Sequence, residues 1–299
     1  MSSSSNNSCS KSKCDQFLES YRPRQNWSLP STVIYYIAKN PKTKELYQKL
    51  IQSCKYFFVK NPILILESLF FNHKNNKWTV NVKQLQKQFD LNNVLCKFWI
   101  TEELKVLSDE PTSFSSITPF IDHCDAKKLR LQNQNISLDE FSLISSKVEN
   151  MTLSDTVVKN YYGSTVPFEK LVEELPKIKD LQFSDNHASS SITTFTAKKL
   201  SEMPHFSQID YFGLSNIPET FNIETLFTYI KKNQSTKFFL HFSDSISQAY
   251  KNRLEAINDE ILETETHEYK IPHIDFEGLD YVTRNRLLSF QLCLPAVLQ

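Results

Sequence analysis

The chain has 299 residues, of which 40% are hydrophobic, and its 34 basic side chains balance 34 acidic ones. That length allows two modest domains, or one repeat domain with an N-terminal module. The balanced charge argues against a long-range electrostatic hold on nucleic acid or on an anionic membrane, so we expect neither as a partner. The three glycines are isolated. Because a dinucleotide- or phosphate-binding loop needs clustered glycines, we expect no cofactor.

Cysteine and histidine spacing gives no sign of a metal or redox site. None of the six cysteines stands in a C-x-x-C pair, and none of the seven histidines in an H-E-x-x-H motif. The first residues lack an apolar secretion signal, and no apolar run approaches the ~18 residues of a membrane span. We therefore expect a cytoplasmic or nuclear protein that binds no metal.

The first part of the chain changes from polar to helical sequence. Residues 1–25 are polar and are predicted to be a disordered tail. Residues 26–71 are predicted to form a small helical module. Pro30 is typical of the first turn of a helix, and Pro41 ends that helix and begins a second one. The apolar stretch 63–71 is expected to be buried, as helix or strand.

Residues 72–119 are predicted to hold connecting strands and a linker. Apolar and polar residues alternate over 78–82, which favours a strand, and 94–107 is expected to form a pair of strands. Prolines and serines make 108–119 the predicted linker.

One short strand pattern recurs five times in residues 120–299. Each copy reads apolar, variable, apolar, small or polar, and then mostly Asp or Asn, which is typical of a strand with one buried face that ends in a turn. The copies are Leu129–Asn133, Met151–Asp155, Leu181–Asp185, Ile209–Gly213 and Leu240–Asp244. A strand that recurs every ~20–30 residues, with helical sequence in between, is the signature of a leucine-rich-repeat solenoid. The predicted fold class is therefore α/β, an irregular leucine-rich-repeat-like solenoid behind a small helical module.

The segments between these strands support the same fold. Helices are expected at 138–144, 166–175, 195–203, 223–232 and 247–263. Residues 269–271 are expected to add a weaker sixth strand, and 287–294 to cap the end of the solenoid.

Side chains alternate along a strand, and this defines a buried face and an open face. The expected buried column is Leu131, Leu153, Phe183, Tyr211 and Phe242. The expected partner-binding face is the outward column Arg130, Thr152, Gln182, Asp210 and His241. This column is polar and chemically mixed, as a recognition surface for a protein target should be. Phe212 is either an exposed anchor of that face or a residue packed under a loop, and the sequence leaves both open.

The helical module carries a family resemblance. The residues concerned are Leu29-Pro30, Val33-Ile34, Ile37, Leu50 and Ser53–Phe57. A Leu-Pro start, an aliphatic pair and a closing Cys-Lys-aromatic run resemble an F-box, although Asn40–Lys44 stands where an aliphatic-rich connection is usual. The resemblance implies docking on a Skp1-type adaptor protein, through a contact centred on Leu29, Pro30, Val33 and Ile34.

The chain as a whole, from residue 27 to about 280, resembles a nematode-expanded family of F-box-like proteins with a degenerate leucine-rich-repeat body. The segments that carry this resemblance are Tyr35–Pro41, Gln52–Phe57, Phe98–Thr101, Asn216–Glu219 and Phe242–Ser247. It implies a substrate receptor of a Skp1-containing ubiquitin ligase. Such a protein is not itself an enzyme: it holds an unknown target protein, and partner enzymes carry out the transfer chemistry.

Two other interpretations stay open. The first is a repeat-based binding protein with no ubiquitin connection, whose F-box-like module serves only as an N-terminal cap. The second is an enzyme. The only His/Cys/Asp cluster is His123-Cys124-Asp125, and neighbouring side chains on a strand point to opposite faces, so these three are not expected to converge as a catalytic triad. We therefore expect no catalytic residue and no small-molecule substrate.

Overall fold

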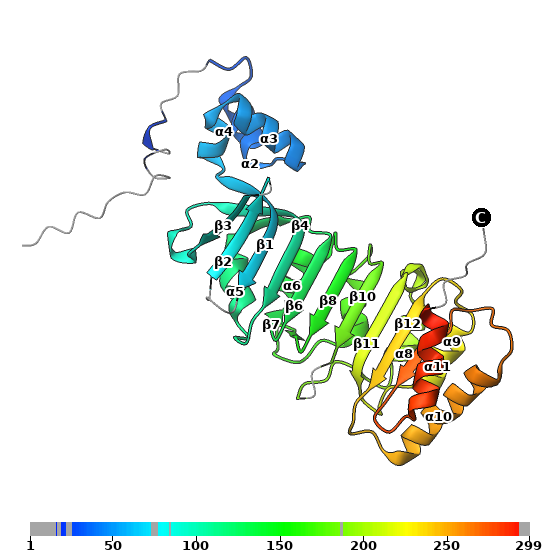
Figure 1. Cartoon of the computed structure of the whole chain (residues 1–299). Helices are drawn as coiled ribbons and strands as arrows, with labels where there is room; N and C mark the ends of the chain where they lie inside the picture. Colours follow the sequence, from blue (N-terminus) through cyan, green and yellow to red (C-terminus); the bar gives the residue numbers. More distant parts are fainter. Residues whose placement is uncertain are drawn as a thin grey trace, which may run out of the picture.

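The computed structural model describes residues 16, 19–21, 26–72, 77–83, 85–185 and 188–292. These residues form a mixed α/β structure around one large, mostly parallel sheet (Figure 1). The predicted disordered tail, residues 1–25, lies almost entirely outside the described residues.

Eleven strands of the described residues make up the sheet, in the order β13-β12-β11-β10-β8-β6-β4-β1-β2-β3, with β5 beside β4. Their bounds are β1 Ile63–Asn72, β2 Lys77–Val82, β3 Leu85–Phe89, β4 Lys97–Leu107, β5 Ile121–Cys124, β6 Lys128–Gln132, β8 Asn150–Ser154, β10 Asp180–Ser184, β11 Tyr211–Ile217, β12 Lys237–Phe242 and β13 His273–Asp275. Strand β2 runs antiparallel to β1 and β3, and the other pairings are parallel. A separate parallel pair joins β7 (Asn135–Ser137) to β9 (Val157–Lys159).

Helices cover one face of the sheet and flank its two ends (Figure 1). The N-terminal helical module consists of α2 Ser31–Lys39, α3 Lys44–Ser53 and α4 Lys55–Lys60. The later helices are α5 Ser113–Ile117, α6 Leu138–Ser145, α7 Phe168–Glu173, α8 Thr196–Glu202, α9 Ile223–Ile230, α10 Gln248–Glu263 and α11 Tyr281–Leu292. Short 3-10 turns occupy Leu91–Asn93 (η1), Thr118–Phe120 (η2) and Pro204–Gln208 (η3).

The core lies between the sheet and the helices, and the strands build it in register. In one inward column, Leu131 of β6 pairs with Leu153, and Leu153 with Phe183. The column continues from Phe183 to Leu214 and from Leu214 to Leu240. All five side chains are at most 3% exposed. A second buried column runs beside it and consists of Leu129, Met151, Leu181, Phe212 and Phe238. Burial stabilises the fold by about 1.5–3 kcal/mol for each large apolar side chain.

The fourth and fifth strands lie in a different register from the predicted one. The sequence predicts a strand at 209–213 with Tyr211 inward, whereas β11 turns Phe212 and Leu214 inward. Moving the motif from Ile209 to Phe212 is a shift by an odd number of residues, so it exchanges the two faces of the strand. The prediction that Tyr211 belongs to the buried column is therefore wrong.

The fifth strand keeps its predicted face but not its predicted partner. Leu240 and Phe242 are both buried, as expected. Leu240, rather than Phe242, lies opposite Leu214, and Phe242 lies opposite Ile217. A bulge between Leu214 and Ile217 separates these two pairs, and Asn216 within it has a φ of 57°.

The Asn or Asp that closes the repeat motif has a backbone role. Asn133 and Asp155 have φ of 52° and 49°, in the left-handed region that Asn and Asp tolerate better than other residues with a side chain. The amide of Asn133 donates to the carbonyl of Ser154 at 2.9 Å. The amide of Asp155 donates to the carbonyl of Ser184 at 3.2 Å. These turns extend the hydrogen-bonded ladder past the strand ends, so neighbouring strands end at the same level.

The sheet begins earlier in the chain than the sequence predicts. The segment assigned to the end of the helical module is strand β1, which pairs with β4. Strand β4 is one long strand rather than the pair expected at 94–107, and it pairs with β6. The sheet that carries the repeats therefore starts at Ile63 rather than at residue 120. The sixth repeat strand is β13 rather than 269–271.

Several predicted elements are confirmed. Strand β2 matches the alternating segment 78–82. Helices α6 to α10 occupy the five ranges expected between and after the repeat strands, to within two residues at either end. At the C-terminal end, α11 contacts β13 and α10, and its Leu287 is fully buried, as expected of a cap. Residues 293–294 of the expected cap lie outside the described residues.

One buried tyrosine fastens the helical module to the sheet. Tyr47 of α3 is fully buried against Ile63 of β1 and Trp99 of β4. Its hydroxyl accepts a hydrogen bond from the backbone N–H of Ile63 at 3.1 Å and donates one to the carbonyl of Asn61. Burial raises the pKa of Tyr47 to about 12, so the hydroxyl keeps its proton at neutral pH.

Replacing Phe183 with alanine should strongly destabilise the protein. The side chain is buried in the inward column, where it contacts Phe168 with ring centroids 4.4 Å apart, so its removal leaves a cavity. We expect the free energy of unfolding to fall by about 3–5 kcal/mol, measured by urea denaturation. The outward neighbour supplies the control: Gln182→Ala should change it by less than about 0.5 kcal/mol. Equal effects of the two substitutions would contradict the observed register.

Candidate functional site

The helical module presents an apolar row to solvent. Val33 and Tyr36 lie three residues apart on α2, so they share one helix face, and Leu29 precedes the helix. The exposed fractions of Leu29, Val33 and Tyr36 are 48%, 41% and 67%. Pro30 is exposed beside them at the start of α2. We call Leu29, Pro30, Val33 and Tyr36 the α2 row. Three of the four residues predicted to contact an adaptor are thus exposed, at or just before the start of α2.

The fourth predicted adaptor residue, Ile34, belongs to the core of the module. It is 5% exposed and packs with Ala38 and Phe57. Trp27 covers this cluster, with its ring centroid 5.6 Å from that of Phe57. Successive residues on a helix point about 100° apart, and here Val33 turns to solvent while Ile34 turns to the core. Ile34 therefore faces the module's own core in this structure, and its adaptor contact stays a prediction.

The open face of the sheet carries part of the predicted partner-binding column. Arg130, Thr152 and Gln182 lie side by side on β6, β8 and β10, on the face away from the buried columns. Arg130 also forms an ion pair with Glu103 at 3.7 Å. The column continues at Gly213 and Phe239, which pair with Gln182 and with each other.

Asp210 and His241 do not occupy the predicted positions in that column. Asp210 precedes β11 and is exposed at its start, where its backbone amide donates to the carbonyl of Lys179. His241 is partly exposed and pairs with Asp275 of β13, farther along the strand than Phe239. Both residues border the open face, but neither lies in line with Arg130.

Phe212 is a core residue and not an anchor for a partner. It is fully buried, and its ring centroid lies 5.0 Å from that of Phe206 and 5.8 Å from that of Phe238. These neighbours come from η3 and β12. The prediction of an exposed aromatic at this position is therefore wrong, and the alternative of a packed Phe212 is closer to the structure.

A tyrosine that sequence reasoning assigned to the core lies on the open face instead. A Cβ atom added to Gly213 would lie 3.0 Å from Cε1 of Tyr211 and 3.3 Å from its hydroxyl oxygen. The Tyr211 ring thus rests close to the backbone of Gly213, and a larger residue there would require the ring to shift by a few tenths of an ångström. Burial raises the pKa of Tyr211, with a smaller contribution from Asp180.

The far end of the open face is closed by a stacked pair. The imidazole of His273 lies 4.7 Å from the ring of Phe239 with an angle of 25° between the planes. Its Nδ1 atom is buried without a hydrogen-bond partner among the described residues. Burial lowers the pKa of His273 and outweighs the opposite effect of Asp275. Arg284 and His241 act in the same direction as burial.

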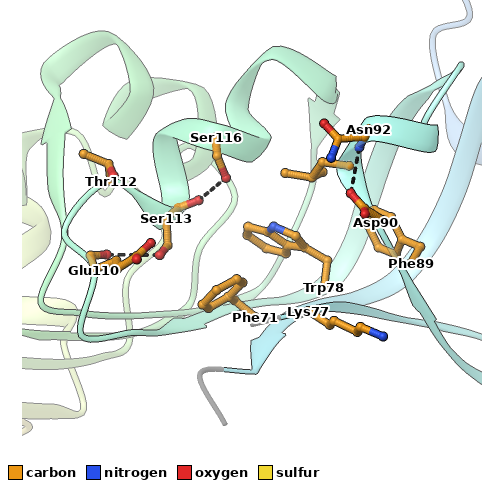
Figure 2. Close-up of a pocket in the computed structure, with 11 residues that line it drawn as sticks. Phe71, Lys77, Trp78, Phe89, Asp90, Asn92, Glu110, Thr112, Ser113 and Ser116 are labelled. Carbon is orange, nitrogen blue, oxygen red and sulfur yellow. Dashed lines mark hydrogen bonds between the residues drawn. The ribbon is translucent and has the colours of Figure 1, made fainter. Parts of the chain in front are cut away.

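A cavity of about 440 Å³ opens between the β2–β3 hairpin and α5. Figure 2 shows the Trp78 ring below α5, with Phe71 beside it and Asp90 and Glu110 on opposite rims. The ring centroids of Phe71 and Trp78 are 5.1 Å apart. The carboxylate of Asp90 accepts from the backbone N–H of Asn92 at 2.9 Å. The described residues that line this cavity therefore include an aromatic floor. Asp90 on its rim caps the 3-10 turn η1.

The side chains of His123, Cys124 and Asp125 do not converge, as expected: His123 and Asp125 contact Trp99, and Cys124 points to the opposite side. The ring of His123 stacks on Trp99 with centroids 4.3 Å apart. Asp125 accepts a hydrogen bond from the indole N–H of Trp99 at 2.7 Å. Cys124 points into the core, where burial raises the pKa of its thiol to about 12. The thiol is therefore protonated and buried, which does not suit a nucleophile.

The described residues hold no group of three or more His, Cys, Asp or Glu side chains placed to bind a metal ion. In the same part of the chain, every helix is too short or too polar to cross a membrane. No family model, no curated protein and no solved structure matches the chain. The functional argument therefore rests on the surfaces described above.

Stability should fall below about pH 6.5, the ordinary pKa of histidine, because of His273. Since the folded protein lowers this pKa, the unfolded chain takes up a proton first as the pH falls, and stability is lost until the folded pKa is reached. The loss is at most about 1.4 kcal/mol per pH unit. His273→Phe should remove this slope in urea denaturation between about pH 7.5 and about pH 5.5. His205→Gln is the control, and an unchanged slope in His273→Phe would refute this assignment.

Proposed function

We propose that this protein recognises other proteins, most concretely as a substrate receptor of a Skp1-containing ubiquitin ligase. In this proposal the α2 row holds the adaptor and the body of the protein holds the target. The transfer chemistry belongs to partner enzymes. The observation that carries the proposal is the separation of two accessible surfaces, an apolar one on the helical module and a polar one on the open face of the sheet.

We infer that the body is a leucine-rich-repeat-like solenoid. In support, strands β6, β8, β10, β11 and β12 run parallel, each contributes two residues to shared buried columns, and helical segments return the chain on one face. A repeat of this kind leaves the opposite strand face free along its length, and repeat proteins bind partners on such extended surfaces.

The adaptor part of the proposal draws on the α2 row. Large apolar side chains clustered on the surface of a small module mark interaction sites more often than chance. Leu29, Val33 and Tyr36 are such a cluster, while Ile34 supplies the core beneath them. This division suits an F-box-like module, because one face of the first helix then remains for a partner.

A second candidate function is repeat-based binding with no ubiquitin connection. The observation that favours it is the burial of Tyr47 between Ile63 and Trp99. This contact covers the amino ends of β1 and β4 and so shields that end of the core from solvent. In this case the helical module would protect the sheet and would need no partner of its own.

Replacing Leu29 and Val33 together with alanine should abolish pull-down of a Skp1-type adaptor and leave the melting temperature nearly unchanged. Both side chains are exposed in the α2 row, so their loss removes contact surface without creating a cavity. The measurement is co-purification with the adaptor at micromolar protein concentration, together with a thermal melt.

Ile34→Ala is the matched control for that experiment. Because Ile34 is buried with Ala38 and Phe57, its truncation should lower the melting temperature. If the unaltered protein fails to bind any Skp1-type adaptor, the ligase function is ruled out and the cap function is favoured. If only Ile34→Ala reduces binding, the adaptor surface is not the α2 row.

A further inference from the structure

A lysine-rich groove lies where α3 meets the amino ends of the repeat strands. It has a volume of about 360 Å³, and five lysines line it: Lys42, Lys44, Lys127, Lys147 and Lys177. The first two stand at the start of α3, and the other three come shortly before β6, β8 and β10. Five cations thus converge from four separate segments of the chain.

Two of these lysines already have an acidic partner. Lys44 and Lys127 each lie 3.7 Å from a carboxylate oxygen of Glu102. The remaining three, Lys42, Lys147 and Lys177, are exposed, and no ion pair within 4.0 Å joins them to a carboxylate of the described residues. We call Lys42, Lys147 and Lys177 the open lysines.

Three carboxylates also line the groove: Glu45, Asp125 and Glu149. Asp125 accepts the indole N–H of Trp99 at 2.7 Å. Glu149 pairs with Lys179 at 2.7 Å. Lys179 is the main cause of the lowered pKa of Glu149, and the charges of Lys127 and Lys177 add smaller contributions in the same direction. Glu45 is exposed at the first turn of α3. The lining thus holds five lysines and three carboxylates, an excess of positive charge.

We propose that this groove binds an acidic segment of a partner protein, with Asp, Glu or phosphorylated side chains placed against the open lysines. This inference rests on the proposed role in protein recognition but needs no adaptor. In this inference, charged groups of the target bind at the amino ends of the strands, beside the helical module, in addition to the column that contains Arg130.

The groove suits an acidic protein segment better than a nucleic acid. Nucleic-acid sites combine a strong basic field with exposed aromatic rings on which bases stack. The lining residues here include no aromatic side chain, and Glu45, Asp125 and Glu149 stand between the lysines. A continuous phosphate backbone would be repelled by these carboxylates, whereas a peptide can place neutral residues opposite them.

The test measures fluorescence anisotropy of a short fluorescein-labelled peptide rich in Glu, titrated with the full chain at low salt. A phosphoserine-containing peptide forms the second arm, and peptides with Gln or Lys in place of Glu are the ligand controls. We expect binding of the acidic peptides only, weakening as salt is added because exposed charges are screened. The preferred acidic peptide then distinguishes carboxylate from phosphate as the source of charge.

The protein variant for this test is Lys42→Glu, Lys147→Glu and Lys177→Glu combined. It should weaken binding of the Glu-rich peptide by roughly tenfold or more, since like charges now face the ligand. The matched control changes Lys87, Lys159 and Lys232 to Glu. These three are exposed elsewhere and give the same net charge. It should weaken binding by less than about threefold, because only general attraction is lost.

Three results would overturn the proposal. The first is no binding of either acidic peptide at millimolar protein concentration. The second is an equal loss in the groove variant and in the control, which would mean nonspecific attraction. The third is tighter binding of single-stranded RNA than of the acidic peptides. None of these depends on adaptor pull-down, so failure of this inference and failure of the ligase proposal can be told apart.

Discussion

The parallel register of the repeat strands is the constraint on which the rest of the structure depends. Strands β6, β8, β10, β11 and β12 each align two apolar residues with those of the neighbouring strand, as Leu153 aligns with Leu131 and Phe183. Parallel strands must be joined by crossovers, and here the crossovers carry helices to one side only (Figure 1). The inward columns are thereby buried, and the opposite face stays accessible.

The same constraint gives the amino and carboxyl ends of the repeat strands different chemistry. Because the repeat strands are parallel, their amino ends lie together on one side of the molecule and their carboxyl ends on the opposite side. Lysines precede three of these strands, at Lys127, Lys147 and Lys177, so they lie together at the amino ends. At the carboxyl ends, Asn133, Asp155 and Asn216 have left-handed backbones, and Asn133 and Asp155 form turns there. A neutral chain thus acquires a basic groove through topology and not through composition.

The sequence predicted the recurrence of strand and helix, because two apolar residues per strand and a closing Asn or Asp leave a readable period. It misplaced β11, because Ile209, Tyr211 and Gly213 also alternate with other residues. Phe212-Gly213-Leu214-Ser215-Asn216 fits the full motif better, down to its final Asn. For Ile34, the sequence did not decide which of the two adjacent residues faces the core, because Val33 and Ile34 are both aliphatic. The lysine groove could not be predicted from the sequence, because Lys42 lies near Lys147 and Lys177 only when α3 docks on the sheet.

That docking also bears on how the proposed receptor would work. Tyr47 lies in a buried contact with Ile63 and Trp99, and its hydroxyl links the backbone at Asn61 and Ile63. A tyrosine held by packing on both sides and by two hydrogen bonds resists rotation of the helical module against the sheet. An adaptor bound to the α2 row would then hold the groove and the open face in one orientation. For a ligase receptor this matters, because partner enzymes reach only those target residues that the receptor positions.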